Sequence, residues 1–124
     1  MKEILAIIRM NKLAPTKKAL VEAGFDGLTA TKAMGRGKLL KDLTILEKVQ
    51  DENRDMVLES LLKGGRLIPK RLISLVVKDS EVQKAVDTII AANKEGNIGD
   101  GKIFVLPISD VVRIRTGEKG EAAV

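Results

Sequence analysis

The chain contains no cysteine, histidine, tryptophan or tyrosine, and its aromatic residues are limited to Phe25 and Phe104. Without cysteine or histidine there is no thiolate nucleophile, no imidazole base and no soft-metal site. Disulfide bonds are excluded for the same reason. Two phenylalanines offer too little stacking surface for a typical RNA-binding platform. No nucleophile and base stand in a recognisable pair, so these absences favour a binding protein over an enzyme.

Length and charge narrow the class of protein further. A chain of 124 residues, 44% hydrophobic and 31% charged, suits a single soluble domain with one core. Its 22 basic and 17 acidic residues leave a net charge of +5, which suits nucleotides, nucleic acid or an acidic protein surface equally. The apolar run at 4–8 is too short for a signal peptide and ends at Arg9, so we expect a cytoplasmic protein without membrane insertion.

Strand and helix signals follow the order strand, helix, strand, and then repeat it. The predicted elements are a strand at 2–9, a helix with Pro15 in its first turn that stops at Gly24, a strand at 27–34, a strand at 71–77, a helix opened by a Ser80/Gln83 capping box and stopped at Gly96, and strands near 102–106 and 111–115. Residues 118–124 are predicted to form a mobile C-terminal tail.

Two βαβ units of this size predict an α/β fold, a ferredoxin-like sandwich with both helices on one face of the sheet. The strands at 2–9 and 71–77 are apolar on nearly every position, which indicates burial on both faces. The face without helices therefore needs a cover. Symmetric self-association would supply it, so we expect a homo-oligomer with the open sheet faces at its centre.

The segment 36–68 is longer than an ordinary connection between strands. Asp51 is placed to cap a helix with an apolar stripe through Val57, Leu58, Leu61 and Leu62. Two interpretations stay open. The apolar stripe packs onto its own domain, or the segment is an arm that binds a partner and changes with ligand.

Glycines and cations gather in two places that suit a bound anion. The stretch 97–107 carries Gly99, Gly101 and Lys102, and 113–117 adds Arg113 and Arg115. A second glycine pair, Gly35 and Gly37, follows the strand at 27–34. Glycines let backbone N–H groups approach an anion closely, so the sequence indicates a nucleotide-binding protein.

These motifs resemble the PII-type nitrogen-regulatory signal proteins along the chain, apart from the middle segment. The matching stretches are 1–9, 19–24, Gly35 and Gly37, Pro69-Lys70, 99–104 and 113–117. The long segment with Gly35-Arg36-Gly37-Lys38 at its base, together with Asn97, is most similar to the nitrogenase-associated branch of methanogens.

The resemblance implies a trimer, or a hetero-oligomer with a paralogue, in which ATP and ADP compete for clefts between subunits. It further implies that 2-oxoglutarate binds beside Mg-ATP at the base of an extended T-loop, 36–68, which contacts the dinitrogenase component. ATP with 2-oxoglutarate would relieve the inhibition of nitrogenase. The alternatives are another target, such as an ammonium transporter, or an RNA-binding ferredoxin-like domain.

Site residues are carried over from the resemblance one position at a time. Those implied for the nucleotide are Thr29, Gly35, Gly37, Lys38, Gly99, Asp100, Gly101, Lys102, Arg113 and Arg115, with Asp100 expected to act mainly in forming the turn. Those implied for 2-oxoglutarate are Gly37, Lys38, Leu39, Lys70 and Gly99. Lys70 also fits an ordinary surface lysine, and the alternation of Arg113 and Arg115 also fits a solvated strand face.

Two positions depart from the family pattern. Lys38 stands where most members have arginine, which keeps the charge and loses the bidentate fork. Leu39 stands where most members have a glutamine that helps to ligate magnesium, and leucine has no ligating atom. The absence of tyrosine excludes the nucleotidylation of a loop tyrosine that regulates some relatives.

Overall fold

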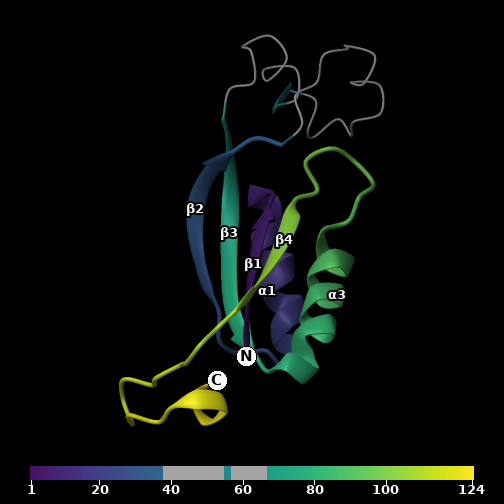
Figure 1. Cartoon of the computed structure of the whole chain (residues 1–124). Coiled ribbons are helices and arrows are strands. Elements are labelled where there is room, and N and C mark those ends of the chain that lie inside the picture. The colour runs from purple at the N-terminus through teal and green to yellow at the C-terminus, as the bar shows by residue number, and fades with distance from the viewer. Residues whose placement is uncertain (38–54, 57–66) are drawn as a thin grey trace.

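The computed structural model describes residues 1–37, 55–56 and 67–124. A four-stranded antiparallel sheet in the order β2-β3-β1-β4 packs against two helices (Figure 1). Its elements are β1 (Lys2–Ile8), α1 (Leu13–Glu22), β2 (Thr29–Gly35), β3 (Ile68–Val77), α3 (Val82–Asn93) and β4 (Lys102–Pro107), with short 3-10 turns at Met10–Lys12, Asp79–Glu81 and Gly120–Ala123. This strand order confirms the predicted ferredoxin-like fold.

The core lies between the sheet and the two helices. Alternate side chains of β1 and β3 point into it, and Leu20 of α1 and Ile89 of α3 close it from the other side. Among the described residues, the buried apolar side chains of this core are Ile4, Ala6, Ile8, Leu20, Phe25, Ile73, Leu75, Val77, Ala85 and Ile89. Ile90, next to Ile89 on α3, lies outside this core and is 45% exposed.

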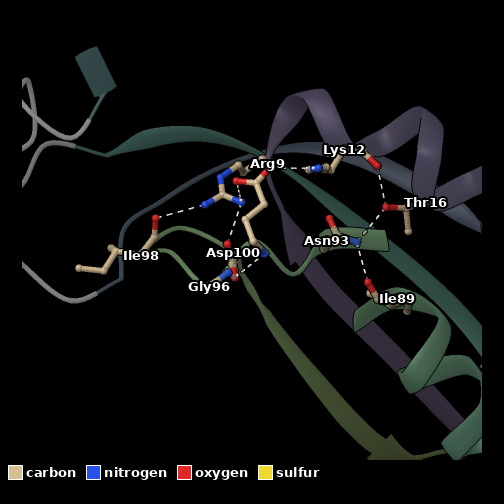
Figure 2. Close-up of polar contacts among 9 residues, drawn as sticks. Arg9, Lys12, Thr16, Ile89, Asn93, Gly96, Ile98 and Asp100 are labelled. Atoms are coloured by element: carbon tan, nitrogen blue, oxygen red, sulfur yellow. Dashed lines mark hydrogen bonds and ion pairs between the residues drawn. The ribbon is translucent and has the colours of Figure 1, made fainter. Parts of the chain in front are cut away.

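A buried polar bridge joins the two helices near the end of the core. Asn93 of α3 donates from Nδ2 to Thr16 Oγ1 at 2.9 Å and to the carbonyl of Ile89 at 2.9 Å, and Thr16 donates in turn to the carbonyl of Lys12 at 2.6 Å (Figure 2). These bonds fix the end of α3 against the start of α1. The loop that follows α3 therefore leaves from a defined position.

The opposite face of the sheet is largely apolar and carries no helix. Strand register places Leu5 beside Phe104, Ile7 beside Leu72, and Glu3 beside Leu106 on this face. Phe104 is 45% exposed and Leu106 is 36% exposed. We name this surface the open face; it is formed by Glu3, Leu5 and Ile7 of β1, Leu72 and Val76 of β3, and Phe104 and Leu106 of β4. The expected self-association would cover this face, which is exposed in a single chain.

Two local predictions were wrong. Residues 111–115 form no strand: Val112 makes one isolated bridge to Lys119, and Ile114 is fully exposed. Alternation alone does not make a strand when no neighbouring strand is available to pair with it. The Ser80/Gln83 capping box is also absent, because the chain enters α3 through a 3-10 turn and Gln83 donates to Asp87 instead.

The expected tail, 118–124, folds back onto 111–113 through several hydrogen bonds. Gly120 N–H donates to the carbonyl of Val111 at 2.9 Å, and the carbonyl of Ala122 accepts from Arg113 at 3.3 Å. The mobility of this tail stays a prediction. β2 stops at Gly35 and β3 begins at Ile68, and the predicted arm, 36–68, falls between these two strands and includes the first residue of β3. Its role as an arm stays a prediction. The Asp51-capped helix and its apolar stripe lie outside the described residues.

Candidate functional site

One end of the sheet gathers most of the predicted ligand-binding positions. The register pairs Ile8 with Arg71, Ile7 with Lys102 and Gly35 with Ile68, so β1 and β2 end where β3 and β4 begin. The turn 96–101 and both ends of the arm leave the sheet from this edge (Figure 1). Gly35, Gly37, Lys70 and the turn 96–101 thus lie on neighbouring elements.

Asp100 forms the turn at 96–101. Its Oδ2 accepts backbone N–H groups from Glu95 at 3.0 Å and Gly96 at 2.9 Å. Burial alone would raise the pKa of Asp100, but these two hydrogen bonds and the guanidinium of Arg9 outweigh it, so the pKa lies below its ordinary value. Both oxygens of this carboxylate therefore contact groups of the protein itself, which supports the turn-forming role expected for Asp100.

Arg9 is the buried centre of an ion-pair cluster at this edge (Figure 2). Its Nη1 lies 2.9 Å from Asp100 Oδ1 and 3.1 Å from Glu95 Oε2, and Lys12 Nζ lies 3.0 Å from Glu95 Oε1. Nη2 donates to the carbonyl of Ile98 at 3.2 Å. Only 4% of Arg9 is exposed, so these contacts form where water screens them little.

Two glycines shape the turn for different reasons. Gly101 has φ +113°, and a Cβ there would lie 2.1 Å from the carbonyl oxygen of Ile7, so this position packs directly on the backbone of β1. Gly99 has φ +100°, and a Cβ there would lie 3.4 Å from the Arg9 guanidinium. Only glycine adopts these angles readily. The Gly99 N–H has no hydrogen-bond acceptor among the described residues.

Gly35 and Gly37 differ from that pair. Neither has a positive φ, and an added Cβ at either would meet no atom within 4 Å. The described part of the chain therefore imposes no requirement for glycine at these two positions. No atom of the described residues fills the space beside them, as a site that receives a bulky ligand would need. Thr29 lies at the other end of β2, about 20 Å away along a seven-residue strand.

Lys70 stands beside the turn at the start of β3. Its Nζ contacts the carbonyl of Gly99 at 3.5 Å, and no described carboxylate pairs with it. Burial first, and the charge of Arg9 second, lower the pKa of Lys70 below its ordinary value. A partly buried ammonium beside a second cation favours an incoming anion, because an anion would supply the missing opposite charge.

The three expected phosphate-binding cations do not meet within one chain. Lys102 begins β4 at the turn, whereas Arg113 and Arg115 follow the far end of that strand (Figure 1). The strand spans about 17 Å from Lys102 to Pro107. A site that uses all three cations therefore requires a second copy of the chain.

Arg113 is held within its own chain by the C-terminal segment. Its Nη1 pairs with Glu118 Oε1 at 2.8 Å, and both side chains remain partly exposed. Ile114, between Arg113 and Arg115, is fully exposed. Ile114 and Arg115 are thus exposed, whereas Arg113 is only partly exposed and is bound to the C-terminal segment.

The structure bears only in part on the positions expected near the loop base, on metal binding and on membrane insertion. Lys38 and Leu39 lie outside the described residues. Across 1–37, 55–56 and 67–124, no group of acidic, cysteine or histidine side chains is arranged to hold a metal ion. Within the same ranges, no helix has the length and apolar character needed to cross a membrane.

Sequence reasoning missed Arg9 and Glu95 as parts of this edge. Arg9 was interpreted only as the residue that ends an apolar strand, and Glu95 was given no role. The available signal was an arginine directly after a strand that is apolar on both faces. Such an arginine is expected to be buried, and a buried guanidinium needs carboxylate partners. Those partners lie far away in the sequence, beyond α3.

Known proteins resemble this chain along its length. The family model for nitrogen regulatory protein P-II matches residues 1–118. "Nitrogen fixation nifHD region GlnB-like protein 2" of Methanobacterium ivanovii is 46% identical over 127 residues, which cover 100% of this chain and 99% of that protein. "Nitrogen regulatory protein P-II" of Azospirillum brasilense is 44% identical over 128 residues, with 100% of both chains covered.

A solved structure extends the likeness to the fold. The crystal structure of Arabidopsis thaliana PII bound to citrate has a TM-score of 0.74 and 32% identity, over 99% of this chain and 91% of that one. The topology, the glycine turn and the cation-bearing loop thus occur together in a chain whose relatives are signal regulators rather than enzymes. This chain belongs to the P-II family of nitrogen regulatory proteins.

Proposed function

We propose that this protein senses ATP, ADP and 2-oxoglutarate and regulates nitrogen fixation by binding nitrogenase through the segment 36–68. The observation that carries the proposal is the edge of the sheet where Lys70, the turn 96–101 and both ends of that segment meet. A ligand bound at this edge would contact the base of the segment directly. Its binding energy could therefore bias the conformation of the segment.

The nucleotide would bind between two copies of the chain. One copy would contribute Gly35, Gly37 and the turn 96–101 with Lys102, and the other would contribute Arg113 and Arg115. The separation of these cations within one chain supports such a shared site. Thr29, on the same strand as Gly35, would lie towards the base end of the nucleotide. Mg²⁺ would be held mainly by the phosphates of ATP.

The open face supports the assembly that such a site needs. Apolar side chains such as Leu5 and Phe104 would be covered if three copies met through this face. We therefore propose a trimer, formed by this chain alone or together with a paralogue. Each contact between neighbouring copies would then hold one nucleotide.

2-Oxoglutarate would bind at Lys70. The ammonium is partly buried, lacks a carboxylate partner among the described residues, and has a pKa lowered by its surroundings. A dicarboxylate is the complementary ligand. The Arabidopsis relative was solved with citrate, another small polycarboxylate, which is compatible with a carboxylate site in this fold.

The names of two relatives in methanogens, both called nitrogen fixation nifHD region proteins, support a target in nitrogen fixation. We propose that the segment 36–68 blocks the dinitrogenase component when ATP and 2-oxoglutarate are scarce. Moving the chain from mostly bound to mostly free requires a preference of about 5 kcal/mol between two states. Several charge-assisted contacts at about 1.5–3 kcal/mol each can supply it.

Titration calorimetry on the purified protein tests the first step. We expect ATP and ADP to compete, and 2-oxoglutarate to bind only when Mg-ATP is present. An assay of nitrogenase turnover with added protein tests the second step, with inhibition expected and relief by ATP plus 2-oxoglutarate. No nucleotide binding in the low-millimolar range would refute the proposal. Nucleotide binding without any effect on nitrogenase would refute the target alone.

A further inference from the structure

Two consecutive carbonyl groups in the turn 96–101 contact cations from two different parts of the chain. Arg9, after β1, donates to the carbonyl of Ile98 at 3.2 Å, and Lys70, on β3, contacts the carbonyl of Gly99 at 3.5 Å. The two cations differ in how firmly they are fixed. Arg9 is buried and ion-paired with two carboxylates, whereas Lys70 is only partly buried and lacks a described carboxylate partner.

We propose that Arg9, held by Glu95 and Asp100, is a positioning residue that fixes the Ile98–Gly99 peptide so that its N–H points to the nucleotide phosphates. The inference rests on the proposed function, because it assumes that this turn receives the phosphates. Arg9 acts through the backbone of the turn and does not touch the ligand. The contact that it uses is the hydrogen bond to the carbonyl of Ile98 (Figure 2).

The geometry of the peptide bond connects Arg9 to that N–H group. The carbonyl of Ile98 and the N–H of Gly99 belong to one planar trans peptide and point in opposite directions. A donor that holds the carbonyl on one side therefore sets the direction of the N–H on the other. The Gly99 N–H has no acceptor among the described residues, so it is available to a ligand, whereas the next N–H, of Asp100, is used by the carbonyl of Asn97 at 3.2 Å.

The glycine at this position makes an external anchor necessary. With φ +100°, Gly99 occupies a region where side chains do not restrict the backbone, and an unheld glycine peptide rotates easily. The guanidinium of Arg9 lies against Gly99 as well as against the carbonyl of Ile98. Its position is fixed in turn by Glu95, which also pairs with Lys12 at the start of α1.

Arginine is suited to this role because its two terminal nitrogens act on different partners. Nη1 contacts Glu95 and Asp100, while Nη2 donates to Ile98. A lysine keeps the charge but has one terminal nitrogen, so it cannot reproduce this fork. The Arg9→Lys variant therefore separates positioning from simple positive charge.

The test measures ATP affinity by calorimetry for the full-length protein and its Arg9→Lys, Arg9→Gln and Glu95→Gln variants. Lys17→Gln serves as the control, since it removes one positive charge from an exposed position on α1. We expect Arg9→Lys to weaken ATP binding about tenfold, equivalent to about 1.4 kcal/mol, and the control to change it less than twofold. Unchanged ATP affinity in Arg9→Lys would overturn the inference.

A double-mutant cycle tests whether Glu95 acts through Arg9. Glu95→Gln should weaken ATP binding in the presence of Arg9 and have no further effect in Arg9→Gln. An equal effect of Glu95→Gln in both backgrounds would contradict the proposed chain of contacts. Glu95→Gln leaves the Arg9–Asp100 pair in place, so it provides a folded variant even if Arg9→Gln is too unstable to measure.

Amide hydrogen exchange supplies a readout that does not depend on nucleotide. In Arg9→Lys, the Asp100 N–H, which is bonded to the carbonyl of Asn97 across the turn, should exchange faster, while the core amides of β1 and β3 keep their protection. Unchanged exchange at Asp100 would refute the positioning role even if ATP affinity fell. If the unaltered protein bound no ATP, the proposed function would fail, and exchange at Asp100 would still decide whether Arg9 fixes the turn.

Discussion

Replacing Lys70 by glutamine should abolish much of the affinity for 2-oxoglutarate without harming the fold. The ammonium is partly buried, has no described carboxylate partner and makes one long contact, 3.5 Å, to the carbonyl of Gly99. Little native structure therefore depends on it. Losing a charge-assisted hydrogen bond to a carboxylate costs about 1.5–3 kcal/mol, which corresponds to a loss of affinity of about 10- to 100-fold.

Calorimetry with 2-oxoglutarate in the presence of saturating Mg-ATP measures this loss. Lys17→Gln removes the same charge from an exposed helix position and should leave the affinity within about twofold. ATP affinity in the absence of 2-oxoglutarate should change little in Lys70→Gln, which separates the two ligands. Equal 2-oxoglutarate affinity in Lys70→Gln and the unaltered protein would refute the assignment of this lysine.

The pH dependence of the same titration provides a second check. Burial and the charge of Arg9 lower the pKa of Lys70 from its ordinary value of 10.5. The carboxylate requires the ammonium form, so affinity should fall as pH rises through this lowered pKa, before an ordinary lysine titrates. Lys70→Gln should lack this decline. A decline of the same size in the variant would assign the titration to another group.

Three further outcomes follow from the contacts described above. Gly101→Ala should lower the melting temperature by several degrees, because strain at a positive φ costs about 1–3 kcal/mol and the new Cβ meets the Ile7 carbonyl. Gly37→Ala should keep the melting temperature and weaken nucleotide binding. Equal melting temperatures of the two variants would contradict this. Asp100 has a lowered pKa, so its contribution to stability is present above the ordinary pKa of 3.8 and is lost as pH falls through the lower pKa of the folded state. Denaturation curves should therefore show that acid lowers the free energy of unfolding less in Asp100→Asn than in the unaltered protein. An equal decrease in both proteins would contradict this. Phe104→Asp should dissociate the assembly in size-exclusion chromatography while Val21→Asp, at an exposed position of α1, should not, and an intact Phe104→Asp oligomer would mean that the open face is not the interface.

The strands of the core were predictable from sequence because burial leaves a direct trace in it. The apolar runs at 2–9 and 71–77 became β1 and β3, and the glycine stop at Gly24 followed α1. The segment 111–115 had the alternation of a strand, but pairing depends on a neighbouring strand that the sequence of one chain does not specify. The local sequence pattern therefore predicted the strands of the sheet better than the structure of the segment 111–115 that follows it.

The glycine-bearing turn could be located from the sequence, whereas its contacts with distant residues could not. Gly99 and Gly101 were singled out because glycine lets the backbone approach an anion, and both have a positive φ in the structure. The role of Arg9 was not predictable, because Glu95 and Asp100 reach it only after the chain has completed β3 and α3. A buried guanidinium and a surface guanidinium look alike in a sequence without its partners.

Mixing two inactive variants tests the central claim most directly, namely that the nucleotide site is shared by two copies of the chain. Lys102→Gln and Arg113→Gln should each bind ATP much more weakly than the unaltered protein, because each removes a cation from every site. After joint unfolding and refolding, mixed assemblies should recover tight ATP binding at contacts that pair an intact Lys102 with an intact Arg113. Calorimetry measures the recovered sites against each variant refolded alone. Failure of the mixture to recover any tight site, although mixed assemblies have formed, would contradict the account.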